Sequence, residues 1–187
     1  MTFCAGYVNA YTFIVRGNTL VAGQAGNVVF LSVDLIQNNV SNVRDKLLTL
    51  IAFIMGVFLL TIYKEKLRIV KKSILSLIPL AILSIIIAFV PQTVDNIYLV
   101  PPLAFCMGLV TTAFGDYFRT KHTPFLREGF IFVSLLSSFV LGVVFSAYLT
   151  IFYHEKTILG VPIMMSVFYL SMLFASWQKK VKEKASF

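Results

Sequence analysis

Charged residues are scarce in this chain, and their scarcity excludes most water-soluble folds. Asp, Glu, Lys and Arg make up 13% of the 187 residues, whereas soluble domains carry about a quarter. Hydrophobic residues make up 58% of the chain, and the mean hydropathy is +0.87. So few charges cannot cover a surface that faces water. We therefore expect an integral membrane protein.

Cysteine and histidine are equally rare, with two of each. Cys4 and Cys106 fall inside apolar segments, so we expect buried thiols rather than a disulfide or a metal pair. His122 and His154 lie in predicted loops on opposite sides and cannot share a metal ion. The stretch GQAGN at 23–27 lacks the glycine spacing, the lysine and the preceding strand of phosphate-binding loops. We predict no catalytic residue, no metal, no cofactor and no enzymatic activity.

Long apolar windows recur along the whole chain. A helix needs roughly 20 residues to cross about 30 Å of hydrocarbon. Such windows lie at about 19–37, 46–63, 73–91, 98–118, 128–153 and 158–177, and a shorter one lies at 2–15. A window as short as the first is typical of a signal-peptide core or a re-entrant segment, or of a helix that starts before residue 1. We predict an all-α polytopic transmembrane helical bundle of about seven spans, forming one domain over 1–187.

Basic residues gather in alternate loops. The loop at 63–72, the loop at 119–127, the tail at 178–187 and the turn with Arg16 hold most of the Lys and Arg residues. Because cytoplasmic loops attract these residues, we expect a cytoplasmic C-terminal tail and an N-terminus on the outer side. The net charge of +8 is spread between apolar stretches. It therefore indicates lipid headgroups, not nucleic acid, as the partner.

Two short motifs recur and indicate a degenerate internal repeat. FCAGYV at 3–8 matches FCMGLV at 105–110, and AFIMGV at 52–57 resembles SFVLGV at 138–143. These matches define halves of about 1–91 and 98–177, of which the second has lost about sixteen residues. Parallel repeats would then place YHEK at 153–156 on the opposite side from YKEK at 63–66. A re-entrant break within 128–153 is the other interpretation.

Polar residues follow one face of the window at 19–37. If a helix starts at Leu20, the spacing puts Gln24, Asn27, Leu31, Asp34 and Asn38 on that face. Polar side chains in membrane helices face the bundle interior or a water-filled cavity. Asn9 in the first window is a natural partner for Asn27 if the two segments pack antiparallel. The amides therefore either line a solute site or join helices, and Asp34 is expected to be solvated.

Small residues indicate where helices approach closely. The candidates for close packing are Gly6, Ala10, Gly23, Gly26, Gly108 and Gly142. Ser134, Ser138, Gly142, Ser146 and Thr150 recur every four residues and predict a packing ridge. Asp116 lies near a span end, where we expect it to pair with Arg119.

Three short motifs carry a resemblance to a known family. GYVNA at 6–10 and AGN at 25–27, followed by an F-x-x-G helix at 53–56, resemble the YoaK-like family of bacterial inner-membrane proteins, a domain of unknown function. The resemblance implies a multi-pass protein of the bacterial cytoplasmic membrane. Family members carry Asp where this chain has Asn9, and amides where it has Val110 and Thr111. An asparagine cannot titrate, so a proton-carrying role of that Asp would be lost here.

Two functions remain compatible with these residues. The first is small-solute transport or binding at the interface of the repeat halves, with Asn9, Gln24 and Asn27 as polar contacts. The alternative is a non-transporting membrane scaffold or sensor, in which the same residues only pack helices. The expected partners are the lipid bilayer and a small solute, with a homo-oligomer as a further candidate.

Overall fold

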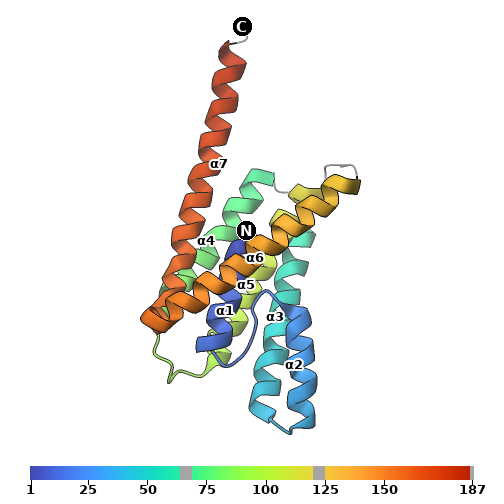
Figure 1. Cartoon of the computed structure of the whole chain (residues 1–187), viewed down its shortest axis with the longest axis vertical. Coiled ribbons are helices and arrows are strands. Elements are labelled where there is room, and N and C mark those ends of the chain that lie inside the picture. The colour runs from blue at the N-terminus through green and yellow to red at the C-terminus, as the bar shows by residue number, and fades with distance from the viewer. Residues whose placement is uncertain (64–68, 120–124, 186–187) are drawn as a thin grey trace.

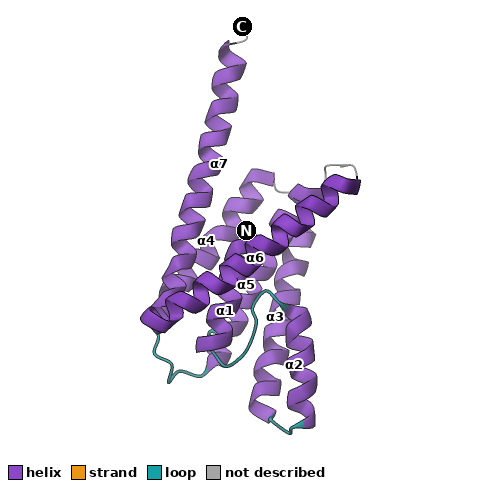
Figure 2. Cartoon of the chain, viewed as in Figure 1, coloured by secondary structure: helices purple, strands orange, loops and turns teal. Residues whose placement is uncertain are grey.

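The chain folds into helices joined by short loops. The computed structural model describes residues 1–63, 69–119 and 125–185, and in these ranges it contains no strand (Figure 2). Side chains are described outside 63, 69–76, 114–119, 125–130, 132, 172, 175–176 and 179–185. The helices are α1 Thr2–Val15, α2 Gln24–Ile36, α3 Val40–Tyr63, α4 Ile69–Ala88, η1 Asn96–Tyr98, α5 Val100–Arg119, α6 Phe125–Tyr153, η2 His154–Leu159 and α7 Gly160–Ala185. The all-α prediction is confirmed.

Helix boundaries follow from local residue chemistry. Gly17 and Asn18, directly after α1, both have positive φ, a conformation that ends a helix and turns the chain. Asn38 has positive φ after α2, and His154 has positive φ after α6. Pro101 and Pro102 lie in the first turn of α5, where a missing N–H costs nothing. These residues explain why most helices end close to the predicted window edges.

The count of seven spans is wrong. Three stretches of the described residues are long and apolar enough to cross a membrane: Val40–Ile62, Asn96–Ala113 and Val133–Ser171, the last of which runs from α6 through η2 into α7. The predicted span at 19–37 contains only the 13 residues of α2. At 1.5 Å per residue, α2 is about 20 Å long. It is therefore too short to cross the hydrocarbon of a bilayer.

The direction of α2 explains this correction. In Figure 1, α1 and α2 both run downward, because residues 16–23 turn back upward between them. The chain therefore does not cross the bundle between these two helices. Arg16 lies at the lower end, beside the loop after α4, whereas α3 ends and α4 begins at the upper end. The prediction that Arg16 shares a side with the 63–72 loop is wrong for this reason.

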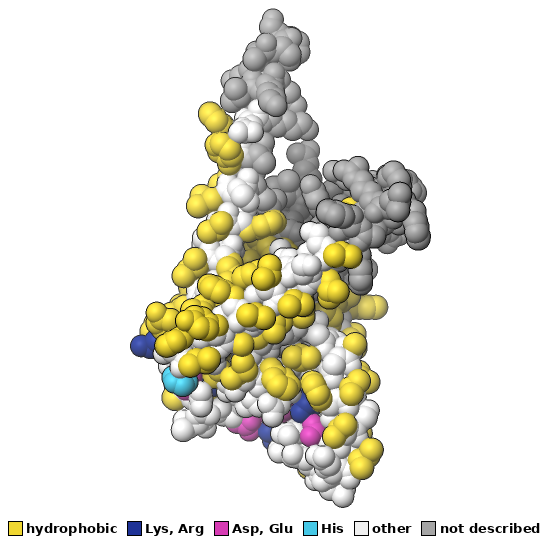
Figure 3. All heavy atoms as spheres, in the orientation of Figure 1, with side chains coloured by type: hydrophobic (Ala, Val, Ile, Leu, Met, Phe, Trp, Pro, Cys, Tyr) yellow, Lys and Arg dark blue, Asp and Glu magenta, His cyan; other side chains and the backbone are white. Residues whose placement is uncertain are grey.

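The surface of the bundle is apolar over most of its height. Exposed large side chains lie along α3, α6 and α7, among them Phe58, Leu141 and Leu170. Figure 3 shows hydrophobic side chains across the middle of one face, with the charged side chains that it draws below them. Because such a band would be unstable in water, these helices are suited to lipid contact.

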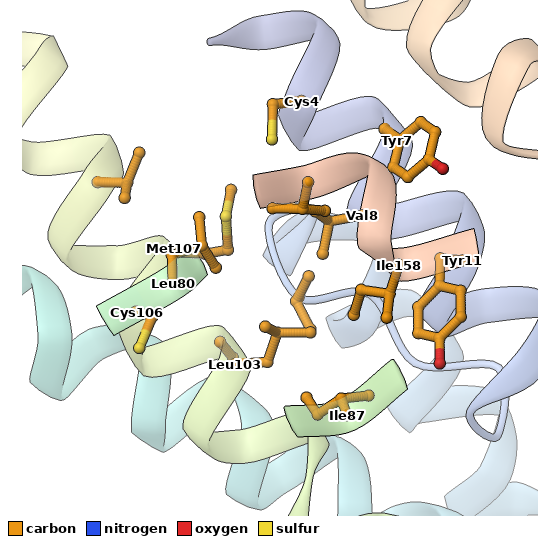
Figure 4. Packing of buried hydrophobic residues seen from close by; sticks show 14 of the residues in the cluster. Cys4, Tyr7, Val8, Tyr11, Leu80, Ile87, Leu103, Cys106, Met107 and Ile158 are labelled. Carbon is orange, nitrogen blue, oxygen red and sulfur yellow. The ribbon is translucent and has the colours of Figure 1, made fainter. Parts of the chain in front are cut away.

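The buried core joins α1 to α4, α5 and η2. Tyr7 and Val8 of α1, Leu80 of α4, Leu103 of α5 and Ile158 of η2 are fully or almost fully buried (Figure 4). The hydroxyl of Tyr7 also donates a hydrogen bond of 2.5 Å to the carbonyl of Thr157. The core therefore contacts both the first and the last thirds of the sequence.

Two helix pairs cross at reciprocal glycine contacts. A Cβ atom on Gly6 of α1 would lie closer than 3.0 Å to the carbonyl oxygen of Phe139, and one on Gly142 of α6 would meet that of Phe3. The same exchange links α3 and α5, where Gly56 faces Phe105 and Gly108 faces Phe53. All four glycines end a Phe-x-x-Gly sequence. Each crossing therefore brings two backbones into direct contact, as small residues allow in membranes.

We predict that Gly142→Ala lowers the unfolding temperature of the purified protein in detergent, as followed by circular dichroism. The new methyl group would overlap the backbone of Phe3, so α1 and α6 must separate. Overpacking of this kind costs about 1–3 kcal/mol. Gly26→Ala is the matched control, since its methyl group would meet only the Cδ1 atom of Leu20, on a side chain that can move. Equal losses in the two variants would contradict the backbone contact.

Candidate functional site

A short non-helical segment interrupts the predicted second span. Residues 17–23, here called the re-entrant segment, leave the end of α1 and climb beside it to the start of α2 (Figure 1). Apart from the carbonyl of Gly23, which accepts from the first turn of α2, its backbone lies outside a helix. An unpaired polar group costs several kcal/mol in hydrocarbon. The sequence therefore has to supply side-chain partners for this segment.

Asn27 supplies most of those partners. Its Oδ1 atom accepts a hydrogen bond of 2.8 Å from the N–H of Leu20, and its Nδ2 atom donates to the carbonyl of the same residue. Nδ2 also donates to Oε1 of Gln24 at 2.9 Å, and Nε2 of Gln24 donates to the carbonyl of Val21. Asn27 is only 1% exposed. It holds the re-entrant segment and does not bond to Asn9, contrary to the predicted pairing.

Asn9 holds the same segment from the side of α1. Its Oδ1 atom accepts a hydrogen bond of 2.8 Å from the N–H of Ala22. Its Nδ2 atom makes no hydrogen bond to any described residue, although Asn9 is only 3% exposed. That atom lies 3.2 Å from the place where a Cβ atom on Gly23 would be. The glycine therefore leaves room for a free amide group.

A cavity of about 530 Å³ lies beside this amide. Its walls come from α1, from residues 20–26 and from three side chains of α6, namely Phe139, Val143 and Ala147. We call it the α1/α6 cavity. The N–H groups of Gln24 and Ala25, in the first turn of α2, donate to no described residue, and Gly23 provides no side-chain cap. The cavity therefore combines apolar walls with the free N–H groups of a helix start.

The structure separates the three predicted polar contacts. Asn9 and Gln24 line the α1/α6 cavity, whereas Asn27 does not. Both ends of the Gln24 side chain are engaged within the segment, which leaves Asn9 with a free group. Gly23 faces both the side chain of Leu20 and Asn9 of α1, whereas Gly26 faces the side chain of Leu20, and Ala10 lines the cavity. The sequence suggested a helix from Leu20, but α2 starts at Gln24.

Arg16 is buried at the far end of α1 and is 1% exposed. Its guanidinium group donates to the carbonyl oxygens of Ile87, Val90 and Pro91, and its Nε atom lies 3.4 Å from the hydroxyl of Tyr11. The last carbonyl groups of a helix have no partner in the helix and carry partial negative charge. Arg16 therefore closes the C-terminal end of α4 and fixes α1 against it.

Asp34 and Lys46 form an ion pair that joins α2 to α3. The Nζ atom of Lys46 lies 2.7 Å from Oδ2 of Asp34, and their side chains are 3% and 11% exposed. Asp34 is therefore not solvated, contrary to the prediction. The sequence feature that could have predicted this pair is the short polar turn at 37–39. Because the turn is short, α2 and α3 form an antiparallel hairpin whose side chains face one another.

Several predicted residues lie where the structure does not describe side chains. The predicted pairing of Asp116 with Arg119 lies outside the described side chains. So do all the basic side chains of the loops at 63–72 and 119–127. Within the described ranges, no group of three His, Cys, Asp or Glu residues could hold a metal ion. The α6 side chains of the cavity were missed, because only the fold brings α6 across α1.

We predict that Asn27→Leu lowers the unfolding free energy by about 1–3 kcal/mol, measured by reversible unfolding in mixed micelles. Leucine fills a similar volume but leaves the N–H and carbonyl of Leu20 without partners. Gln37→Leu, at an exposed amide just after α2, is the matched control and should have little effect. Equal stability of both variants would show that Asn27 does not hold the segment.

A second prediction concerns the ion pair between α2 and α3. Replacing one partner, as in Asp34→Leu or Lys46→Met, should cost about 3–5 kcal/mol, because a buried charge loses its partner. The double variant should recover most of that loss, since no charge remains buried. A double-mutant cycle on the unfolding free energy measures this coupling. Additive losses would mean that the two charges do not stabilise each other.

Comparison with known proteins places the chain in a family. A family model described as "Protein of unknown function (DUF1275)" matches residues 1–171. No curated protein matches the chain, and no solved structure does either. The match covers every helix from α1 to α6 and the first part of α7. The chain therefore belongs to the DUF1275 family of proteins of unknown function, in agreement with the resemblance carried by its GYVNA and AGN motifs.

Proposed function

We propose that this protein binds a small solute in the α1/α6 cavity and carries it across the bacterial inner membrane. The observation that carries the proposal is the Nδ2 atom of Asn9, which has no hydrogen-bond partner among the described residues and belongs to a residue that lines the cavity beside the uncapped first turn of α2. A buried amide without a partner is costly unless a ligand or water completes it. Secondary transporters place their sites at such interrupted helices.

The helix directions support two inverted halves. α1 runs downward and α5 upward in Figure 1, although both contain the Phe-Cys-x-Gly sequence. α3 and α6 likewise share the Phe-x-x-Gly sequence and run in opposite directions. In an inverted repeat, YKEK after α3 and YHEK after α6 belong on opposite sides. This arrangement removes the conflict that parallel repeats create, and the second half then lacks a copy of α2.

The same directions suggest an orientation in the membrane. The C-terminal ends of α3, α5 and α7 lie at the upper end in Figure 1. The basic loops follow α3 and α5 in the sequence, and the lysines of the basic tail belong to the last turns of α7. The positive-inside rule assigns this end to the cytoplasm. The α2–α3 turn and the corner between α6 and α7 would then face the periplasm.

A non-transporting scaffold is the second candidate. It is favoured by the hydrogen bonds that Asn27 makes within its own segment and by the backbone contacts at the four glycines. These features need no solute. An enzyme is not proposed, because no carboxylate, imidazole or thiol lines the cavity among the described side chains. The two functions differ in whether water reaches the cavity: a transporter needs a cavity that water enters, and a scaffold does not.

The test replaces Ala25, in the cavity wall, by cysteine in a chain whose Cys4 and Cys106 are alanine. A charged methanethiosulfonate reagent is applied to right-side-out and to inverted membrane vesicles. We expect Ala25→Cys to react at least tenfold faster than Val29→Cys, because Ala25 lines the cavity and Val29 does not. Val29 lies one turn further along α2 and is 61% exposed on the apolar surface of the bundle, where a charged reagent does not dissolve. Equally slow reaction of both cysteines from both sides would exclude a water-accessible site and favour the scaffold.

A further inference from the structure

The polar groups that face the α1/α6 cavity are mostly hydrogen-bond donors. Asn9 offers Nδ2, and the first turn of α2 offers the N–H groups of Gln24 and Ala25. Three of the nearby acceptors are already used. Oδ1 of Asn9 accepts from Ala22, and the carbonyls of Leu20 and Val21 accept from the side chains of Asn27 and Gln24. A ligand that completes this group of donors therefore has to present acceptor atoms.

The electrostatic setting favours a negative acceptor. The start of a helix carries about half a positive elementary charge, which stabilises anions placed against it. α2 has 13 residues, no acidic residue in its first turn and no side-chain cap to neutralise that charge. No Asp or Glu lines the cavity among the described side chains. Backbone N–H groups of this kind stabilise a carboxylate even without a basic side chain.

The rest of the cavity is apolar. Phe13 and Leu20 form one part of its wall, and Phe139, Val143 and Ala147 of α6 form the other. Ile14, at the edge of the cavity on α1, is 53% exposed on the apolar surface of the bundle. No basic side chain is among the lining residues that the structure describes. A wall of this kind fits the hydrocarbon part of a ligand. It offers no hydrogen-bonding side chain to a second polar group of the ligand.

We infer that the ligand of the α1/α6 cavity is an amphiphilic monocarboxylate, with its carboxylate on Asn9 and the start of α2 and its hydrocarbon chain against α6. The inference rests on the proposed function and specifies its substrate class. Two sources share this chemistry, since such an acid reaches the site either from the lipid or from water. A chain of several carbons favours entry from the lipid, beside Ile14.

The experiment measures binding of radiolabelled octanoate to the full chain in nanodiscs, with empty nanodiscs as the blank. We expect saturable binding that octanamide, which has the same chain but no charge, displaces at least tenfold less well than unlabelled octanoate. Acetate should also displace at least tenfold less well, because it lacks the apolar part. Equal displacement by octanamide would overturn the carboxylate, and equal displacement by acetate would overturn the amphiphile.

Two variants locate the binding. Asn9→Asp keeps the oxygen that accepts from Ala22 but replaces the free donor by a negative oxygen, so octanoate binding should weaken at least tenfold. Gln37→Glu makes the same chemical change at an exposed position and should leave binding intact. Ala147→Phe should block the cavity from α6 without touching a donor. Both variants must keep the unfolding temperature of the parent protein within a few degrees.

The outcomes separate this inference from the proposed function. Absence of saturable octanoate binding, or unchanged binding in both Asn9→Asp and Ala147→Phe, would overturn the monocarboxylate. The solute site itself would still stand if Ala25→Cys reacts rapidly with the charged reagent, because that reaction reports water in the cavity whatever the ligand is. Slow reaction together with tight, Asn9-dependent octanoate binding would instead indicate a lipid-fed binding site that does not open to water.

Discussion

The whole arrangement depends on one constraint: a backbone that turns back among apolar helices must find its own hydrogen-bond partners. In the re-entrant segment only the carbonyl of Gly23 accepts helical hydrogen bonds, at the start of α2, and Asn27 gives Leu20 both a donor and an acceptor. Asn9 supplies a further acceptor from α1. With these bonds the chain can start a new helix in the middle of the bundle. Without them, residues 19–37 would be expected to form one continuous helix, and the α1/α6 cavity would not exist.

An amide group and a guanidinium group perform the same task at the middle and at the C-terminal end of α1. Near its middle, Asn9 fixes the re-entrant segment, and after its last turn Arg16 satisfies the free carbonyls at the end of α4. Directly before Asn9, the core contacts of Tyr7 and Val8 fix the helix laterally. α1 is thereby held along its length, which gives the Nδ2 atom of Asn9 a defined position. A free donor in a rigid setting is a basis for selective binding.

The sequence predicts much of the fold but less of the site. Periodicity and hydropathy predict the helices at 46–63, 98–118 and 128–153 well, because long apolar windows leave few alternatives. They fail at 19–37, since Gly17, Asn18 and Gly23 interrupt the helix while the hydropathy remains high. Asn9 was recognisable as an amide in an apolar helix. The facing α6 wall was not, because it is separated by about 130 residues and depends on tertiary packing alone.

The crossing of α1 with α6 has a consequence for synthesis. Gly6 and Gly142 contact each other's helices, yet 136 residues separate them in the chain. At 5–20 residues per second, α1 is made on the order of ten seconds before its partner. During that time the glycine face of α1 has no native cover from α6, although Arg16 finds its partners as soon as residues 87–91 are made. The nascent protein therefore needs the insertion machinery, or its own later helices, to shield α1 until the last third of the chain emerges.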